Sequence, residues 1–365
     1  MIAERLIHRA AGYFRRHPVL LLLCFTPGIP EYLSGSSSVA FLVVFPGGTL
    51  LTLLFLGLNL GLYGPGVLLL RELWVGWGRG WGRLLLLGTA YGLLEEGTAL
   101  STLFDPNASV VGGLGHYGRI AGVNWVWLIG VIGVHVVLSV GVPILLLGLS
   151  LPETRGRPLL TRRERTTAIT IFLADALFLA FISGYWRVQF AWLLGAAVVA
   201  VALGYAASRW PEARLDPATA EPRFGPLSAG LLGLAYFPLL LLVPVLGQEA
   251  AWPAAATGAL DLAGAVVLFE TVRRGIGRRH NGAQLTALGF GITLPIVGFG
   301  FLAEAHLPLV LLLDAVYGLF FWALWSRWRD DRGSHEHAAD GGPPPSPWVG
   351  RESTGSGPPS PSSGP

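Results

Sequence analysis

Lysine is absent from this chain, cysteine and methionine occur once each, and charged residues are scarce. Charged residues make up 13% of the 365 positions, whereas soluble domains average about 25%. The single cysteine, Cys24, excludes an intrachain disulfide and a cysteine-based zinc site. All 25 basic residues are arginines, and they cluster at the ends of apolar runs. The pI of about 9.2 therefore indicates charges at a membrane interface, and we expect no nucleic-acid partner.

Long apolar runs dominate what is present. Hydrophobic residues make up 52% of the chain, in runs of roughly 20, the length at which a helix spans about 30 Å of hydrocarbon. These runs predict an all-α, polytopic helical membrane protein with about ten transmembrane helices, surrounded by the lipids of the cell (plasma) membrane. The ten segments cover residues 18–33, 49–70, 84–104, 124–150, 167–186, 188–208, 227–247, 254–272, 285–303 and 307–326.

Arginine asymmetry predicts the orientation. If the N-terminus lies in the cytoplasm, 23 of the 25 arginines fall on the cytoplasmic side, and only Arg119 and Arg187 fall outside. This is the distribution that the positive-inside rule requires, and adding or removing one span would scramble it. Both termini are therefore predicted to be cytoplasmic.

Three parts follow from this topology. A basic cytoplasmic segment covers residues 1–17, the transmembrane domain covers 18–326, and a disordered cytoplasmic tail rich in Pro, Ser and Gly covers 327–365. Within the domain, Pro27 and Pro30 interrupt the first span, and the apolar run that follows it is too short to cross a membrane. Residues 27–48 are predicted either as a broken helix with a re-entrant segment or as an ordinary outer loop.

Two adjacent acids lie in the middle of a predicted span. Glu95 is about 14 Å from the outer end of its segment, and His135 is about 17 Å from the outer end of the next. A carboxylate at this depth needs a partner, water, a proton or a metal, because burying its charge costs a few kcal/mol or more. We therefore expect Glu95, Glu96 and His135 to form one catalytic or proton- and cation-binding site.

Further polar residues surround this predicted site. Tyr91 lies one helical turn before Glu95, and the glycine-rich outer loop over 105–123 is predicted to be either a substrate-binding lid or an ordinary surface loop. Deeper acids elsewhere could be proton sites or could make packing hydrogen bonds. The candidate substrate-binding residues are Tyr91, Asp105, Asn107, His116, Tyr117, Arg119 and Asn124, and the deeper acids are Asp175, Asp261 and Asp314.

The glutamate pair followed by a histidine on a later span resembles the CAAX-protease and bacteriocin-processing superfamily. That resemblance implies a membrane-embedded hydrolase in which Glu95, Glu96 and His135 activate water. The pattern departs at Leu100, where the superfamily has arginine, and at Val131, where it has phenylalanine. The stretch Glu95–Pro143 also resembles an uncharacterised family of prokaryotic polytopic membrane proteins.

Three functions remain open. The leading hypothesis is a secondary transporter of an unknown small molecule or lipid, in which Glu95 or Glu96 binds a proton or cation. The second is a hydrolase in which the glutamates are base or ligands and His135 is a ligand or oxyanion partner. The third is a non-catalytic membrane assembly component. We expect no metal and no cofactor, because the chain offers only one deep histidine and no usable cysteine.

The topology is testable by cysteine labelling. In a Cys24→Ser background, a cysteine introduced in the 105–122 loop should react with a membrane-impermeant maleimide applied from outside intact cells. A cysteine in the 155–165 loop should react only after the cells are opened. The reverse labelling pattern would invert the orientation.

Overall fold

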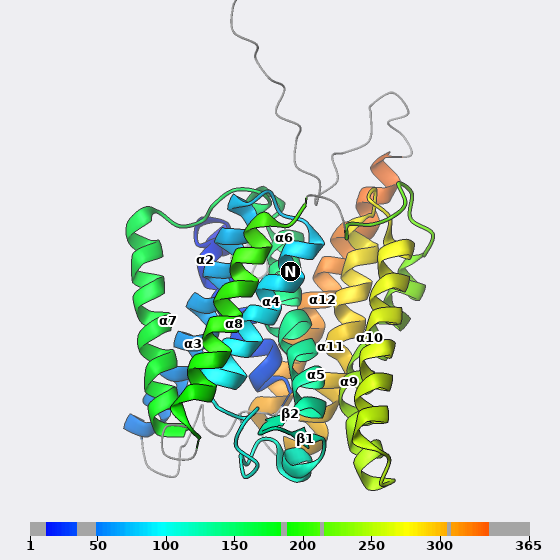
Figure 1. Cartoon of the computed structure of the whole chain (residues 1–365). Coiled ribbons are helices and arrows are strands. Elements are labelled where there is room, and N and C mark those ends of the chain that lie inside the picture. Colours follow the sequence, from blue (N-terminus) through cyan, green and yellow to red (C-terminus); the bar gives the residue numbers. More distant parts are fainter. Residues whose placement is uncertain (1–11, 35–48, 184–187, 212–214, 305–307, 336–365) are drawn as a thin grey trace, which may run out of the picture.

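The computed structural model describes residues 12–34, 49–183, 188–211, 215–304 and 308–335, and these fold into a bundle of long helices (Figure 1). The helices run roughly side by side, and a small two-stranded hairpin lies at one end of the bundle. In chain order they are α2 (Pro18–Pro27), the π-helix η1 (Gly28–Tyr32), α3 (Thr49–Gly76), α4 (Trp81–Gly92), the π-helix η3 (Leu93–Ala99), α5 (Trp125–Val134), the π-helix η5 (His135–Gly141), α6 (Val142–Ser150), α7 (Arg162–Ser183), α8 (Phe190–Arg209), α9 (Pro226–Glu249), α10 (Ala254–Ile276), α11 (Gly282–Glu304) and α12 (Pro308–His335).

The helices confirm the predicted class, a polytopic helical membrane protein. Each predicted apolar segment overlaps a helix, and α5, η5 and α6 form one continuous stretch. Seven helices among the described residues are long and apolar enough to cross a membrane. They are Trp125–Ser150, Arg162–Ile182, Phe190–Arg209, Pro226–Glu249, Ala254–Ile276, Gly282–Leu302 and Pro308–Arg329. The total of ten crossings and the orientation of the termini stay predictions.

The first span differs from the expected broken helix. At Gly28 the chain stays helical but changes from α2 to the π-helix η1, which closes with a bond from the Leu33 amide to the Gly28 carbonyl. Prolines lack an amide donor, so the wider π-turn lets the helix pass them without a break. The predicted re-entrant part beyond Ser34 lies outside the described residues.

The structure adds detail to the predicted outer loop and moves the start of the C-terminal tail. The outer loop contains a short 3₁₀ turn, η4 (Gly112–His116), and a hairpin of β1 (Arg119–Ile120) with β2 (Val123–Asn124). At the other end of the chain, α12 continues to His335, past the predicted start of the tail at 327. Helical hydrogen bonding does not require apolar side chains, so a helix can extend beyond the hydrocarbon. Residues 336–365 lie outside the described residues.

The helices form two groups around a central pair. In Figure 1, α9 to α12 lie on one side, α3 and α7 lie on the other, and α4 and the α5–α6 stretch run between them. A core of buried side chains joins α6, α11 and α12, and a second core joins α3, α4 and η5 around Tyr63, Leu87 and Val140. The central pair is therefore shielded from lipid on both sides, which allows it to hold polar side chains at depth.

Glycines allow a close contact between α9 and α11. A Cβ atom at Gly233 of α9 would lie 2.5 Å from the Leu288 carbonyl oxygen of α11, and one at Gly291 of α11 would overlap the Gly230 carbonyl oxygen of α9. Backbones that approach this closely leave no room for a side chain, as is common where membrane helices pack on small residues.

This contact predicts a position-specific loss of stability. Gly291→Ala should lower the free energy of unfolding by about 1–3 kcal/mol, because the added methyl group meets backbone that cannot move aside locally. Gly298→Ala is the matched control on the same helix, since nothing lies within 4 Å of its Cβ position, and should change stability by less than about 0.5 kcal/mol. Thermal unfolding of the purified protein in detergent measures both, and equal effects would contradict the packing described here.

Candidate functional site

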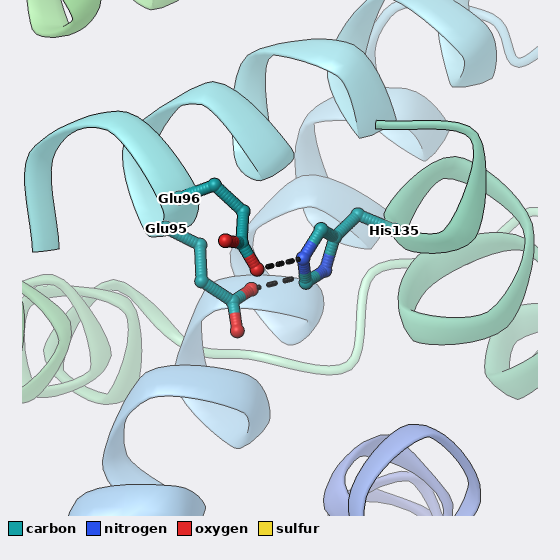
Figure 2. Close-up of side chains that lie close together, drawn as sticks. All are labelled: Glu95, Glu96 and His135. Carbon is teal, nitrogen blue, oxygen red and sulfur yellow. Dashed lines mark hydrogen bonds and ion pairs between the residues drawn. The ribbon is translucent and has the colours of Figure 1, made fainter. Parts of the chain in front are cut away.

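Glu95, Glu96 and His135 meet in the interior of the bundle. The imidazole Nε2 of His135 lies 2.9 Å from Oε1 of Glu96, and its Nδ1 lies 3.2 Å from Oε2 of Glu95. Figure 2 shows the two carboxylates reaching from one helix toward the ring, which projects from the facing helix. The three residues are between 1% and 6% exposed, so none of them contacts bulk solvent. We refer to these three side chains as the Glu–His centre.

Both halves of the Glu–His centre lie on π-helices. The glutamates are in η3, where the Leu100 amide bonds to the Glu95 carbonyl, and His135 begins η5. In an α-helix neighbouring side chains diverge by about 100°, and the wider π-turn reduces that angle. Two adjacent carboxylates can thereby face the same ring. Single π-turns inserted in α-helices occur frequently at functional sites.

Two glycines bring the helices together at this point. A Cβ atom at Gly92 would lie 3.1 Å from Cβ of His135 and 2.8 Å from Cδ1 of Ile132. One turn earlier, a Cβ atom at Gly88 would lie 3.0 Å from Cα of Val136. Gly88 and Gly92 face the same seam because they are one turn apart. Their missing side chains allow the carboxylates to reach the ring.

Aromatic side chains enclose the ring. The Tyr91 ring centroid lies 5.9 Å from that of His135, in an edge-on arrangement, and the Tyr63 centroid lies 6.5 Å away, stacked. The Tyr63 hydroxyl donates a hydrogen bond to the carboxylate of Glu31, which lies on η1. Tyr91 was predicted from its spacing to Glu95, and it is buried beside the centre.

Glu31 and Tyr63 were not predicted as site residues. They link the first helix to the Glu–His centre, although Glu31 and Tyr63 are 32 residues apart. The sequence did hold one indication of Glu31: it is an acidic residue that directly follows Pro30, where the helix was expected to break. Tyr63 carried no signal of its own, because a tyrosine in an apolar segment is common in membrane helices.

Hydroxyl groups complete the polar contacts. Ser139 Oγ lies 3.0 Å from Nδ1 of His135, one turn along η5. The Thr102 hydroxyl donates to the second oxygen of Glu96, and the Trp127 indole nitrogen donates to Thr102 Oγ1 over 3.1 Å. Neither oxygen of Glu95 accepts a hydrogen bond of ordinary geometry from the described residues. Glu95 therefore relies on the nearby imidazole and is the less satisfied of the two acids.

Comparison with known proteins places the chain in a family. Residues 20–323 match the family model of an uncharacterized membrane protein family. The chain belongs to this family. No curated protein and no solved structure matches it. The match includes every residue of the Glu–His centre and excludes the C-terminal tail, and the similarity to the CAAX-protease superfamily stays an expectation from the sequence pattern.

In this member of the family, the predicted substrate-binding residues of the outer loop contact the loop itself rather than the Glu–His centre. Asn124 caps α5 by accepting from the Trp127 amide and donates to the Leu114 carbonyl. Arg119 donates to the carbonyl oxygens of Phe104 and Gly122. Polar side chains in a glycine-rich loop satisfy backbone groups that no helix or sheet pairs.

The other loop candidates lie apart from the centre as well. Asp105 is buried and accepts from the Asn107 amide over 2.8 Å, whereas the Asn107 and His116 side chains are exposed. The Tyr117 hydroxyl donates to the Trp252 carbonyl and contacts the Thr257 hydroxyl, so it holds the loop against α10. A substrate-binding role for these residues stays a prediction, and the contacts give them a structural role.

The deeper acids lie on separate helices. Asp261 on α10 is fully buried, and neither of its carboxylate oxygens has a hydrogen-bond partner among the described residues. Asp175 on α7 packs against Gly61, and Asp314 lies on α12; each has one such unpartnered oxygen. None of the three belongs to the Glu–His centre. A carboxylate without a partner at this depth is stable only when it carries a proton or meets water or a cation.

Removing the imidazole should make stability depend on pH. In His135→Ala the two glutamates lose their cationic partner and must be kept neutral by protons, which are scarcer at high pH. We expect the free energy of unfolding to fall by about 3 kcal/mol at pH 8 and by much less at pH 5. Thermal unfolding in detergent across that range measures the effect.

The matched control is the triple variant with His135→Ala, Glu95→Gln and Glu96→Gln. It has no titratable side chain left at the centre, so its stability should not show the additional loss at pH 8 that is expected for His135→Ala. A loss in His135→Ala that is equal at pH 5 and pH 8 would mean that the histidine acts only by packing.

Proposed function

We propose that the protein is a secondary transporter whose Glu–His centre binds and releases the coupling proton. One observation carries the proposal: a single buried imidazole has a different glutamate at each of its two nitrogens. An imidazolium carries a proton on both nitrogens, so Nε2 can donate to Glu96 while the protonated Nδ1 side, which also contacts Ser139 Oγ, attracts the Glu95 carboxylate as an ion pair. A neutral imidazole carries a proton on only one nitrogen and offers no such charge.

Charge balance supports proton binding. With both glutamates ionised and the ring protonated, the centre carries a net charge of −1. One further proton on a carboxyl group makes it neutral, and neutrality is favoured at bilayer depth. Losing that proton leaves a negative charge that becomes acceptable when water or a cationic group reaches the site. Protonation is thereby linked to whether the centre is open or closed.

Burial supports an alternating mechanism. The centre is sealed from solvent, so a proton or substrate can enter or leave only if the surrounding helices move. The central pair lies between two groups of helices, and a rocking motion of one group against the other would expose it to either side in turn. The transported substrate would be a small molecule or lipid, and cargo selection would involve groups beyond the centre.

A membrane-embedded hydrolase is the second candidate. It is supported by ligand atoms of Glu95, Glu96 and His135 that lie within 4.8 Å of one another, a spacing at which three residues could hold a metal ion. The donor set of two carboxylates and one imidazole suits zinc. However, Glu95 faces Nδ1 and Glu96 faces Nε2, so the ring or one carboxylate would have to turn before all three could bind the same ion.

Infrared spectroscopy tests the proton-binding proposal without a known substrate. Wild-type protein in lipid vesicles should show the carbonyl band of a protonated carboxyl group at neutral pH. Glu95→Gln or Glu96→Gln should leave the fold intact and remove or shift the part of this band that comes from the centre, while any part that comes from Asp261 should remain. Glu153→Gln, at an exposed acid, is the control and should leave the band unchanged. No band attributable to either glutamate across pH 5 to 9 would refute a proton at the centre.

Vesicles and metal analysis separate the two candidates. In vesicles that contain a pH-sensitive dye, a panel of solutes should include one that drives proton movement through wild-type protein and not through the Glu96→Gln variant. One zinc ion per chain that is lost in His135→Ala, together with hydrolysis of a lipid or peptide, would favour the hydrolase instead.

A further inference from the structure

A second polar region lies at the end of the bundle that is predicted to face the cytoplasm. A partly open pocket there is lined by three arginines, Arg71, Arg79 and Arg155, and by Trp74. Its deeper wall is apolar and comes mainly from α6, including Ile144 and Leu147. We call this cavity the arginine pocket. It contains no residue of the Glu–His centre.

One of the three arginines is already neutralised. Arg71 pairs with Glu72 at 2.8 Å and donates to the carbonyl oxygen of Thr154 over 2.6 Å. The same glutamate accepts from the amides of Leu159 and Leu160. This buried network holds the loop after α6 in place. Arg155 donates from Nε to the Gly148 carbonyl oxygen over 2.6 Å, and Arg79 and Arg155 both add their positive charge to the lining of the pocket.

A fourth arginine, Arg327, lies outside the lining of the pocket and adds positive charge near Arg155. The guanidinium of Arg155 lies 5.5 Å from the centroid of the Trp328 ring, and that of Arg327 lies 5.4 Å from the same centroid. Burial, followed by the positive charges of Arg327 and Arg79, lowers the pKa of the Arg155 guanidinium to about 10. Two acids lie nearby, Glu153 beside Arg155 and Asp216 beside Arg79. The positive charges of Arg79 and Arg327 act on Arg155, and this positive potential favours a bound anion.

Two glycines leave room for the arginine side chains. A Cβ atom at Gly156 would lie 3.2 Å from Nη1 of Arg79, and one at Gly148 would lie 3.5 Å from Nε of Arg155. Gly156 also has a φ of +76°, a conformation that residues with side chains rarely adopt. A side chain at Gly156 would press on the Arg79 guanidinium group, and one at Gly148 would contact Arg155.

We propose that the arginine pocket binds a phosphate group. Guanidinium groups recognise phosphate through paired hydrogen bonds, and a basic pocket between helices on the cytoplasmic side suits an anionic lipid headgroup. The apolar wall and Trp74 would contact the glycerol and upper acyl chain of such a lipid. A free phosphate ion would use the same guanidinium groups without the apolar wall.

Lipid retention measured by native mass spectrometry tests whether the phosphate group belongs to an anionic lipid. Wild-type protein in mild detergent with equal phosphatidylglycerol and phosphatidylcholine should retain the anionic lipid preferentially. Arg155→Gln and Arg327→Gln should each weaken that preference about fivefold, the factor that corresponds to about 1 kcal/mol per arginine. Arg163→Gln is the control, because Arg163 is exposed near the start of α7 and lies outside the pocket.

Thermal unfolding in inorganic phosphate tests whether the ligand is free phosphate. If free phosphate is the ligand, millimolar phosphate should raise the unfolding temperature of wild-type protein above that in chloride at equal ionic strength, and Arg155→Gln should abolish the rise. Arg327 is exposed, so Arg327→Gln should fold normally even if Arg155→Gln does not. Equal retention of both lipids with no phosphate effect, or wild-type binding by both variants, would overturn the proposal.

Discussion

The exclusion of uncompensated charge from hydrocarbon is the constraint on which this structure depends. Two glutamates are buried because a histidine on the facing helix hydrogen-bonds to Glu96 and lies 3.2 Å from Glu95, and the central helices meet at that contact. Gly88 and Gly92 permit the approach, and the π-turns aim both carboxylates at one ring. The surrounding helices then keep lipid and water away from the polar centre.

Much of the fold was readable from the sequence, because crossing a bilayer requires helices of fixed length and apolar composition. The meeting of Glu95 with His135 was also predictable, since depth along each span can be counted in residues. Which helices become neighbours cannot be counted in this way. The Glu31–Tyr63 contact depends on how the first helix packs, and for that reason it was missed. The π-turns leave no mark in an apolar pattern.

The outer loop illustrates a different limit. Asp105, Arg119 and Asn124 have the residue types of a binding site, but each of them satisfies backbone groups of the loop. A glycine-rich loop has few neighbours to pair with, so its own side chains take that role. At the opposite end, the buried Arg71–Glu72 network uses the same residue types to hold a loop in place, and it lies beside the arginine pocket. Residue type alone does not separate the two situations.

Each π-turn contains one residue more than an α-helical turn would need. If η3 were wound into α-helix, the segment on one side would turn by about 100° and shift by about 1.5 Å relative to the other. That rotation would carry the glutamates off the ring while their backbone amides and carbonyls exchanged partners within the same helix. In hydrocarbon, where an open backbone group is costly, a moving helix must preserve its own hydrogen bonds. The extra residue in the π-turn would therefore let the helix rotate about its axis while its backbone hydrogen bonds stay paired inside the membrane.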